Sequence, residues 1–172
     1  GNRTPLKKDI LKPNMNDQKI IHFIKGRADP DTMNGVNVVV HNVATVQKEK
    51  NYDVEVWGIT KNLHLTNHKH IYPLHLFKPM NFPFRKNNKL LDRLKTIPKN
   101  TIFHMHSIFI PEFYVFSRSL KKNGFKWVLA PHGGYSSTKN AFLKSIYKKL
   151  IENTLLKEAS AIHVNAAADI DY

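Results

Sequence analysis

Short apolar runs alternate along the chain with longer segments in which apolar residues recur at helical spacing. The runs are rich in Val, Ile and Phe and are bounded by Gly, Pro, Asn or Asp, as is typical of buried strands. We expect strands at 19–24, 52–59, 71–77, 101–106, 126–130 and 161–164. The run at 19–24 indicates a buried strand, whereas the run at 52–59 alternates apolar and polar residues.

Helical segments are expected between these strands, at 35–50, 88–97, 111–123 and 137–159, with another beginning at about 166. The first is ambiguous, because Val-rich sequence favours a strand by propensity. Its length, and the helical spacing of Val36, Val39, Val40, Val43 and Val46, favour a helix whose valines face the sheet. Alternating strands and helices predict an α/β fold: a Rossmann-like, doubly wound parallel sheet of about six strands.

The composition fits one cytoplasmic domain. The chain has 172 residues, 41% of them hydrophobic, which is enough for a sizeable core. It has no Cys, which excludes disulfides and a thiolate nucleophile. No apolar run is long enough to cross a membrane, and no signal peptide opens the sequence. We expect an irregular leader at 1–17 and one domain at 18–172, cut from a longer protein soon after its last strand.

The charge is strongly basic, with 27 Lys and Arg against 13 Asp and Glu, a formal net charge of +14. Such a chain favours anionic partners: phosphorylated small molecules, an anionic membrane surface or nucleic acid. The basic residues are scattered, and no aromatic RNA-binding motif accompanies them. In 137–159, lysines lie near Phe142 and Tyr147, which suits a membrane-surface helix or a core helix with a solvated basic side.

The loop after the expected strand 126–130 is the strongest candidate for chemistry. It contains Pro131, His132, Gly133, Gly134 and Tyr135. In open α/β sheets, ligands bind at the carboxyl ends of the strands. A His there can exchange protons near neutral pH, and two glycines allow the backbone to approach a ligand closely. The alternative is a loop His beside two turn glycines.

Two further positions are weaker candidates. His104 and His106 lie two apart in a strand and so share a face. We expect His106 near His132, and no metal site, because no third ligand is evident. Asn34 and Gly35 precede the first helix, where backbone amides can face an anion or simply cap the helix.

Five segments together resemble the amino-terminal domain of retaining glycosyltransferases with the GT-B fold, of the family 4 type that builds capsule, lipopolysaccharide and exopolysaccharide. The first glycine of the family's G-G-V loop is Asn34 here. The segments that resemble the family's motifs, in order, are Asn34–Val39, Tyr52–Val56, Phe103–Ser107 (V-H-x-H-G), Val128–Gly134 (V-x-x-P-H-G) and Ala159–Asn165.

The resemblance implies an acceptor-binding domain that is inactive alone, because the donor-binding domain with its E-x7-E motif is not in this sequence. It implies His132 as a catalytic residue, with Asn34, Gly35, His106 and the segment 133–135 lining the cleft. No cofactor is implied. The implied partners are a nucleotide-sugar, a glycan or lipid-linked acceptor and the inner membrane face, with no nucleic acid. A basic, non-enzymatic anion- or nucleic-acid-binding module is the alternative.

Overall fold

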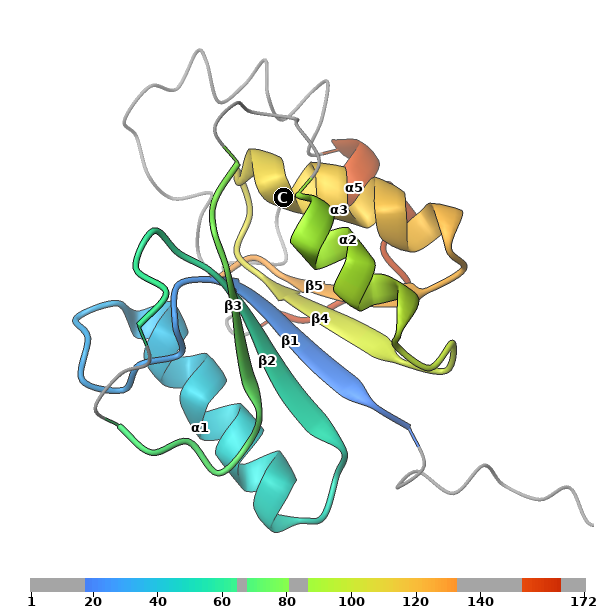
Figure 1. Cartoon of the computed structure of the whole chain (residues 1–172). Helices are drawn as coiled ribbons and strands as arrows, with labels where there is room; N and C mark the ends of the chain where they lie inside the picture. The colour runs from blue at the N-terminus through green and yellow to red at the C-terminus, as the bar shows by residue number, and fades with distance from the viewer. Residues whose placement is uncertain (1–17, 65–67, 81–86, 133–152, 165–172) are drawn as a thin grey trace, which may run out of the picture.

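The computed structural model describes residues 18–64, 68–80, 87–132 and 153–164, which form a parallel six-stranded sheet (Figure 1). The strand order is β3-β2-β1-β4-β5-β6, and every pairing is parallel. The order reverses between β1 and β4, as in Rossmann-like sheets. The α/β fold class predicted from the sequence is therefore confirmed. The strands are β1 (Ile20–Lys25), β2 (Val54–Ile59), β3 (Leu74–Phe77), β4 (Ile102–His106), β5 (Lys126–Ala130) and β6 (Ala161–Ile162).

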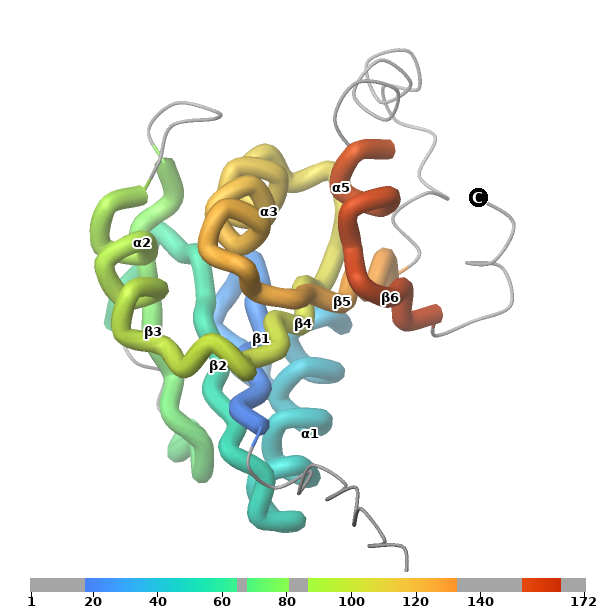
Figure 2. The backbone as a smooth tube through the Cα atoms, turned by 90° about the vertical axis from the view of Figure 1, so that its right-hand side faces the viewer, coloured from blue at the N-terminus to red at the C-terminus, as the bar shows by residue number. Residues whose placement is uncertain are grey.

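Helices lie on both faces of the sheet (Figures 1 and 2). One face carries α1 (Gly35–Glu49). The other carries α2 (Asn88–Lys95), α3 (Pro111–Lys122) and α5 (Asn153–Glu158). Pro111 occupies the first turn of α3, and Gly124 follows its end with a φ of +74°, the two positions where these residue types suit a helix. Connections from β1, β4 and β5 therefore place their loops along one edge of the sheet, at the carboxyl ends of the strands.

The predicted elements match the observed ones with shifts at the ends. β3 begins at Leu74 rather than at 71, and β6 covers only Ala161–Ile162 of the predicted 161–164. Of the long helix predicted at 137–159, α5 is the part within the described residues, and its Leu155 is buried as expected. The leader at 1–17, the rest of that helix and the segment from 166 lie outside the described residues.

The core has two parts, one on each face of the sheet. The larger is rich in aromatic residues: the ring centroid of Phe23 lies 4.9 Å from that of Phe113 and 4.3 Å from that of Phe116. The smaller part lies beneath α1 and is mostly aliphatic, with Val40 and Ala44 against Val54 and Val56. Phenyl rings fill more volume than valines, so the α2–α3 face supplies most of the buried apolar area.

The face that α1 turns to the sheet differs from the predicted valine stripe. Val39 and Val46 are 40% and 47% exposed, whereas Asn37, Val40 and Ala44 are buried. The helix is correctly predicted, but it is rotated about its own axis relative to the expected orientation, because the side chain of Asn37 is buried against the sheet side. Its Oδ1 accepts hydrogen bonds from the backbone N–H groups of Arg27 and Ala28, each at 2.9 Å. A polar side chain that satisfies a buried loop can outweigh the burial of another valine.

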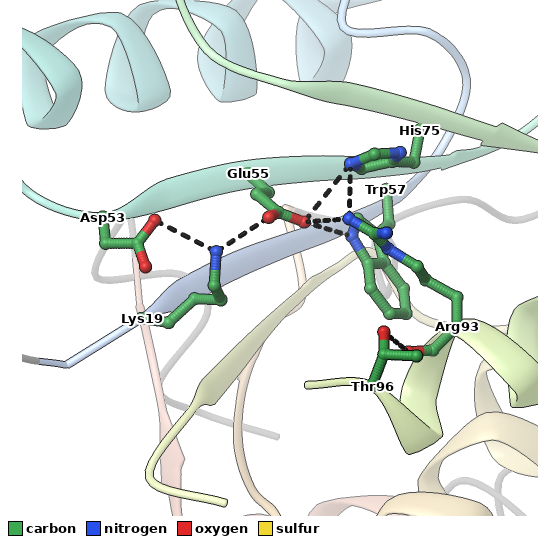
Figure 3. A network of polar contacts seen from close by, with 7 residues as sticks. All are labelled: Lys19, Asp53, Glu55, Trp57, His75, Arg93 and Thr96. Atoms are coloured by element: carbon green, nitrogen blue, oxygen red, sulfur yellow. Dashed lines mark hydrogen bonds and ion pairs between the residues drawn. The ribbon is translucent and has the colours of Figure 1, made fainter. Parts of the chain in front are cut away.

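A buried carboxylate joins three strands to α2 (Figure 3). Glu55 of β2 is 6% exposed and accepts hydrogen bonds from Lys19 Nζ at 2.7 Å and Trp57 Nε1 at 3.0 Å. The oxygen that accepts from Trp57, Oε2, also lies 3.4 Å from His75 Nε2 and 3.6 Å from Arg93 Nη2 of α2. Hydrogen bonding by His75, followed by that of Lys19 and Trp57, lowers the pKa of Glu55 well below its usual range despite burial. This cluster of charged side chains connects β2 with Lys19, with β3 and with α2.

No helix among the described residues is long and apolar enough to cross a membrane.

Candidate functional site

Histidines gather on the α1 face of the central strands. His22 of β1 pairs in register with His104 of β4, and His106 lies two residues further along β4 on the same face. His22 is fully buried, and His106 is 1% exposed. His132 is the second residue after β5, and the neighbouring carboxyl ends of β4 and β5 bring it beside His106.

Hydrogen bonds link these side chains into a chain that we term the histidine relay, consisting of Gln47, His22, His106 and His132. Gln47 Oε1 of α1 lies 2.7 Å from His22 Nε2. His22 Nδ1 lies 2.8 Å from His106 Nε2, and His106 Nδ1 lies 2.9 Å from His132 Nε2. The relay therefore runs from the helix on one face of the sheet to the loop at its carboxyl edge.

Burial and the Gln47 carbonyl oxygen together determine which nitrogen donates in each hydrogen bond of the relay. Burial lowers the pKa of His22 to about 4 and that of His106 well below the usual value, so both rings are neutral at pH 7. With the Gln47 carbonyl as acceptor, His22 donates from Nε2 and must accept at Nδ1. His106 then donates from Nε2 and accepts at Nδ1. His132 consequently donates its Nε2–H to His106, and it can do so whether its ring is neutral or protonated.

His104 lies beside the relay. Its Nε2 is 3.3 Å from Nδ1 of His163, which follows β6, and its ring centroid is 4.1 Å from that of His106. Burial, followed by repulsion from His22, lowers the pKa of His104 to about 3. The nitrogens of His22, His104 and His106 lie within 4.8 Å of one another, so β1 does supply the third ligand that the sequence does not reveal.

Hydrogen bonding with neighbouring side chains nevertheless accounts for these three histidines better than a metal ion does. Two of them are almost fully buried, and each of the three already has a hydrogen-bonded partner. Within the described residues, the charged groups that shift the pKa of His104 and His106 are other histidines, with no carboxylate among them. A divalent cation placed there would be desolvated without a compensating negative charge.

Strained backbone accumulates at the same edge of the sheet. Ser107 and Phe109 after β4 have φ values of +97° and +59°, His132 after β5 has +53°, and Ala28 after β1 has +48°. Residues other than Gly avoid this region, at a cost of about 1–3 kcal/mol each, and such strain concentrates at functional sites. The loops that follow β4 and β5, next to His106 and at His132, therefore have energetically unfavourable backbone conformations.

A cavity of about 850 Å³, which we term the basic cavity, opens at the carboxyl ends of β1, β2 and β3. Lys25, Lys61 and Lys78 line it, one following or ending each strand, together with Asn34 from the α1 loop and Glu112 from the first turn of α3. Three ammonium groups against one carboxylate make the cavity suitable for an anionic ligand. It lies at the same sheet edge as the relay, on the β1–β2–β3 side of the topological switch.

The amino terminus of α1 is already capped. Asn34 Oδ1 accepts from the backbone N–H groups of Val36 at 3.0 Å and Asn37 at 3.4 Å. In this conformation the Asn34 side chain occupies the place where an anion would meet these amides, so Asn34 acts as a helix cap. The close approach that a glycine permits occurs elsewhere: a Cβ at Gly58 would collide with the carbonyl oxygen of Gly26.

The predicted site residues are partly brought together. His106 and His132 are hydrogen-bonded, as expected, and Asn34 lines the basic cavity. Gly35 starts α1 but is not among the residues that line this cavity, and 133–135 lie outside the described residues. The residues that sequence reasoning missed are His22, Gln47, Lys25, Lys61 and Lys78. The lysines could have been found from their positions at strand ends, whereas nothing in the sequence places Gln47 beside His22.

Comparison with known proteins adds little to this picture. No family model matches the chain, and no curated protein sequence matches it. Among solved structures, a homoserine dehydrogenase from S. aureus is similar over 87% of this chain, with 15% identity and a TM-score of 0.42. This chain spans 33% of that dehydrogenase.

Proposed function

We propose that the chain is the acceptor-binding half of a GT-B glycosyltransferase, which moves a sugar from a nucleotide-sugar to a growing glycan in surface polysaccharide synthesis. The observation that carries the proposal is the His106–His132 hydrogen bond at the carboxyl ends of β4 and β5. These are the histidines of the segments that resemble the family's V-H-x-H-G and P-H-G motifs. In the proposal, a second Rossmann-like domain with the E-x7-E motif binds the donor.

In this proposal His132 is the catalytic residue and the relay positions it. The relay presents a neutral acceptor, His106 Nδ1, to the Nε2–H of His132, which holds the imidazole plane at the sheet edge. In the protonated ring, the Nδ1–H then faces the reacting sugar, where it donates a hydrogen bond and stabilises the negative charge that develops as the bond to the nucleotide breaks. A donor preorganised on developing charge is worth more than one that must reorient.

The basic cavity supports an acceptor that carries phosphate, such as a glycan linked through a diphosphate to a lipid. Lys25, Lys61 and Lys78 would hold the diphosphate, while the sugar extends toward the relay. A net charge of +14 also favours an anionic membrane surface, where lipid-linked acceptors reside. The protein would then act on the cytoplasmic side, peripherally attached to the inner membrane face.

Calorimetry on this chain tests the proposal. A short-chain prenyl diphosphate sugar should bind, and Lys25→Ala with Lys61→Ala should weaken it at least tenfold. Lys126→Ala, at an exposed position at the opposite edge of the sheet, is the matched control and should have little effect. UDP- and GDP-sugars should not bind tightly, because donor binding belongs to the second domain. Micromolar binding of a nucleotide-sugar to this chain would overturn the assignment of acceptor and donor halves.

The basic cavity also favours a second candidate, an anion-binding module without catalytic activity. If that module bound nucleic acid, affinity for arbitrary DNA or RNA would fall linearly on a log–log plot against salt, with a slope that reflects several phosphates. Binding of that kind, without prenyl diphosphate binding, would replace the glycosyltransferase proposal.

A further inference from the structure

A second histidine cluster lies away from the relay, between α1 and the segment that leads into β3. We term it the His41 cluster; it consists of His41 on α1 and of His68 and His70, four to six residues before Leu74 opens β3. The ring centroids of His41 and His68 are 4.7 Å apart, those of His68 and His70 are 5.4 Å apart, and those of His41 and His70 are 5.5 Å apart. One nitrogen from each ring lies within 4.8 Å of the others.

This geometry needs only a small contraction to hold a metal ion. Tetrahedral zinc with imidazole ligands places the nitrogens about 3.3 Å from one another. Two of the three ligands come from one H-x-H stretch in a loop, which can adjust, and the third comes from a helix, which is rigid. All three side chains are half-buried, so an ion could enter from solvent, unlike at His22 and His106, which are almost fully enclosed.

A metal-ligating histidine usually hydrogen-bonds through its other ring nitrogen to a carboxylate, a carbonyl or water, and at His41 a phenol hydroxyl takes this place. Nδ1 of His41 is 2.9 Å from the hydroxyl of Tyr72, which is itself 3% exposed. Burial raises the pKa of Tyr72, so the hydroxyl stays protonated and neutral. A His that hydrogen-bonds through Nδ1 offers Nε2 for coordination, with its ring orientation already fixed.

The charges around the His41 cluster differ from those around the relay. Burial, followed by repulsion from His68, lowers the pKa of His41, and burial with repulsion from His41 and His68 lowers that of His70. Neutral imidazole is the form that binds metal. Asp29 and Asp31 counter these shifts at His41, and Asp29 does so at His70, so carboxylates lie near enough to offset the charge of a cation.

We propose that His41, His68 and His70 bind a divalent transition-metal ion, with Zn²⁺ as the best match, in a site that ties the segment before β3 to α1. Three imidazoles suit zinc, copper, nickel and cobalt, whereas magnesium and calcium prefer oxygen ligands. The fourth position is taken by water. The site is independent of the proposed sugar transfer, since its residues are separate from the relay and from the lining of the basic cavity.

Cobalt serves as the probe, because tetrahedral Co²⁺ gives visible absorption that Zn²⁺ abolishes by competition. The chain, freed of metal with a chelator, should bind one Co²⁺ and release it to one Zn²⁺. His41→Ala and His68→Ala should each weaken binding at least tenfold, and Zn²⁺ should raise the melting temperature of the wild type but not of His68→Ala.

Two matched controls locate the metal. His64→Ala removes an exposed His near the same segment, and His104→Gln removes a ligand from the relay-side trio; both should bind Co²⁺ like the wild type. His68→Ala lies in a loop, and its metal-free melting temperature should match that of the metal-free wild type. Equal Co²⁺ binding by the wild type and His68→Ala, or loss of binding in His104→Gln, would overturn the proposal.

Discussion

His106 Nδ1 and His132 Nε2 lie 2.9 Å apart, which joins the last residue of β4 to the second residue after β5. The bond is the outer end of a relay whose inner end is Gln47 on α1. Because His22 and His106 are neutral and the Gln47 carbonyl oxygen accepts from His22, the protons along the relay point in one direction. The loop histidine is therefore oriented from inside the sheet, by the buried rings of His106 and His22.

The buried histidines His22, of the relay, and His104, beside it, predict how stability responds to pH. The folded-state pKa values of His22 and His104, about 4 and about 3, lie below the unfolded value near 6.5. Between these values the unfolded chain binds more protons, so the free energy of unfolding falls as pH falls below about 6.5. Each such histidine contributes a slope of about 1.4 kcal/mol per pH unit. Urea denaturation at pH 6.5 and 4.5 should show a loss of at least about 2 kcal/mol, and equal stability would contradict the buried neutral histidines.

Glu55 predicts a stability effect that separates a buried charge from an exposed one. Glu55→Gln removes the charge on which Lys19, His75 and Arg93 converge, and should lower the free energy of unfolding by about 2–3 kcal/mol. Asp53→Asn is the matched control, since Asp53 pairs with the same Lys19 at 3.0 Å but its side chain is 53% exposed. It should cost less than about 1 kcal/mol. Similar losses for both variants, measured in urea, would mean that burial of Glu55 adds nothing.

Gly58 predicts a packing effect next to the basic cavity. Gly58→Ala would drive a methyl group into the backbone carbonyl of Gly26 and should destabilise the fold by about 2 kcal/mol. At Gly35, a Cβ would meet nothing within 4 Å, so Gly35→Ala should leave stability unchanged or raise it by up to about 1 kcal/mol. Thermal unfolding of the two variants tests this prediction. A Gly58→Ala protein as stable as the wild type would show that β2 can move away from the end of β1 without cost.

The fold could be predicted from the sequence because its signals are local. Apolar runs and turn residues mark the strands, and the proximity of His106 to His132 follows from their positions at the ends of successive parallel strands. The orientation of α1 could not be predicted by periodicity alone. Spacing favours a valine stripe, but the buried amide of Asn37 is needed by the backbone at Arg27 and Ala28.

The inner part of the site depends on contacts between distant segments. His22 and His106 are 84 residues apart, and they meet only because β1 and β4 pair in a particular register. A shift of one residue would turn His22 to the opposite face. The His41 cluster depends on the path of a loop, which hydrophobic patterning does not encode. The lysines of the basic cavity are the exception, because each lies at or just beyond a strand end.

The most direct test of the account is to measure turnover and stability together on His132→Ala, in the full-length enzyme. The account predicts a kcat for sugar transfer lower by about a hundredfold or more, the scale of losing one preorganised donor. The free energy of unfolding should fall by no more than about 1–3 kcal/mol, because His132 is itself half-buried but its loss leaves the buried Nδ1 of His106 without its donor. A well-folded His132→Ala enzyme with near-native kcat would contradict the account, remove His132 from the mechanism and leave His106 as the next candidate.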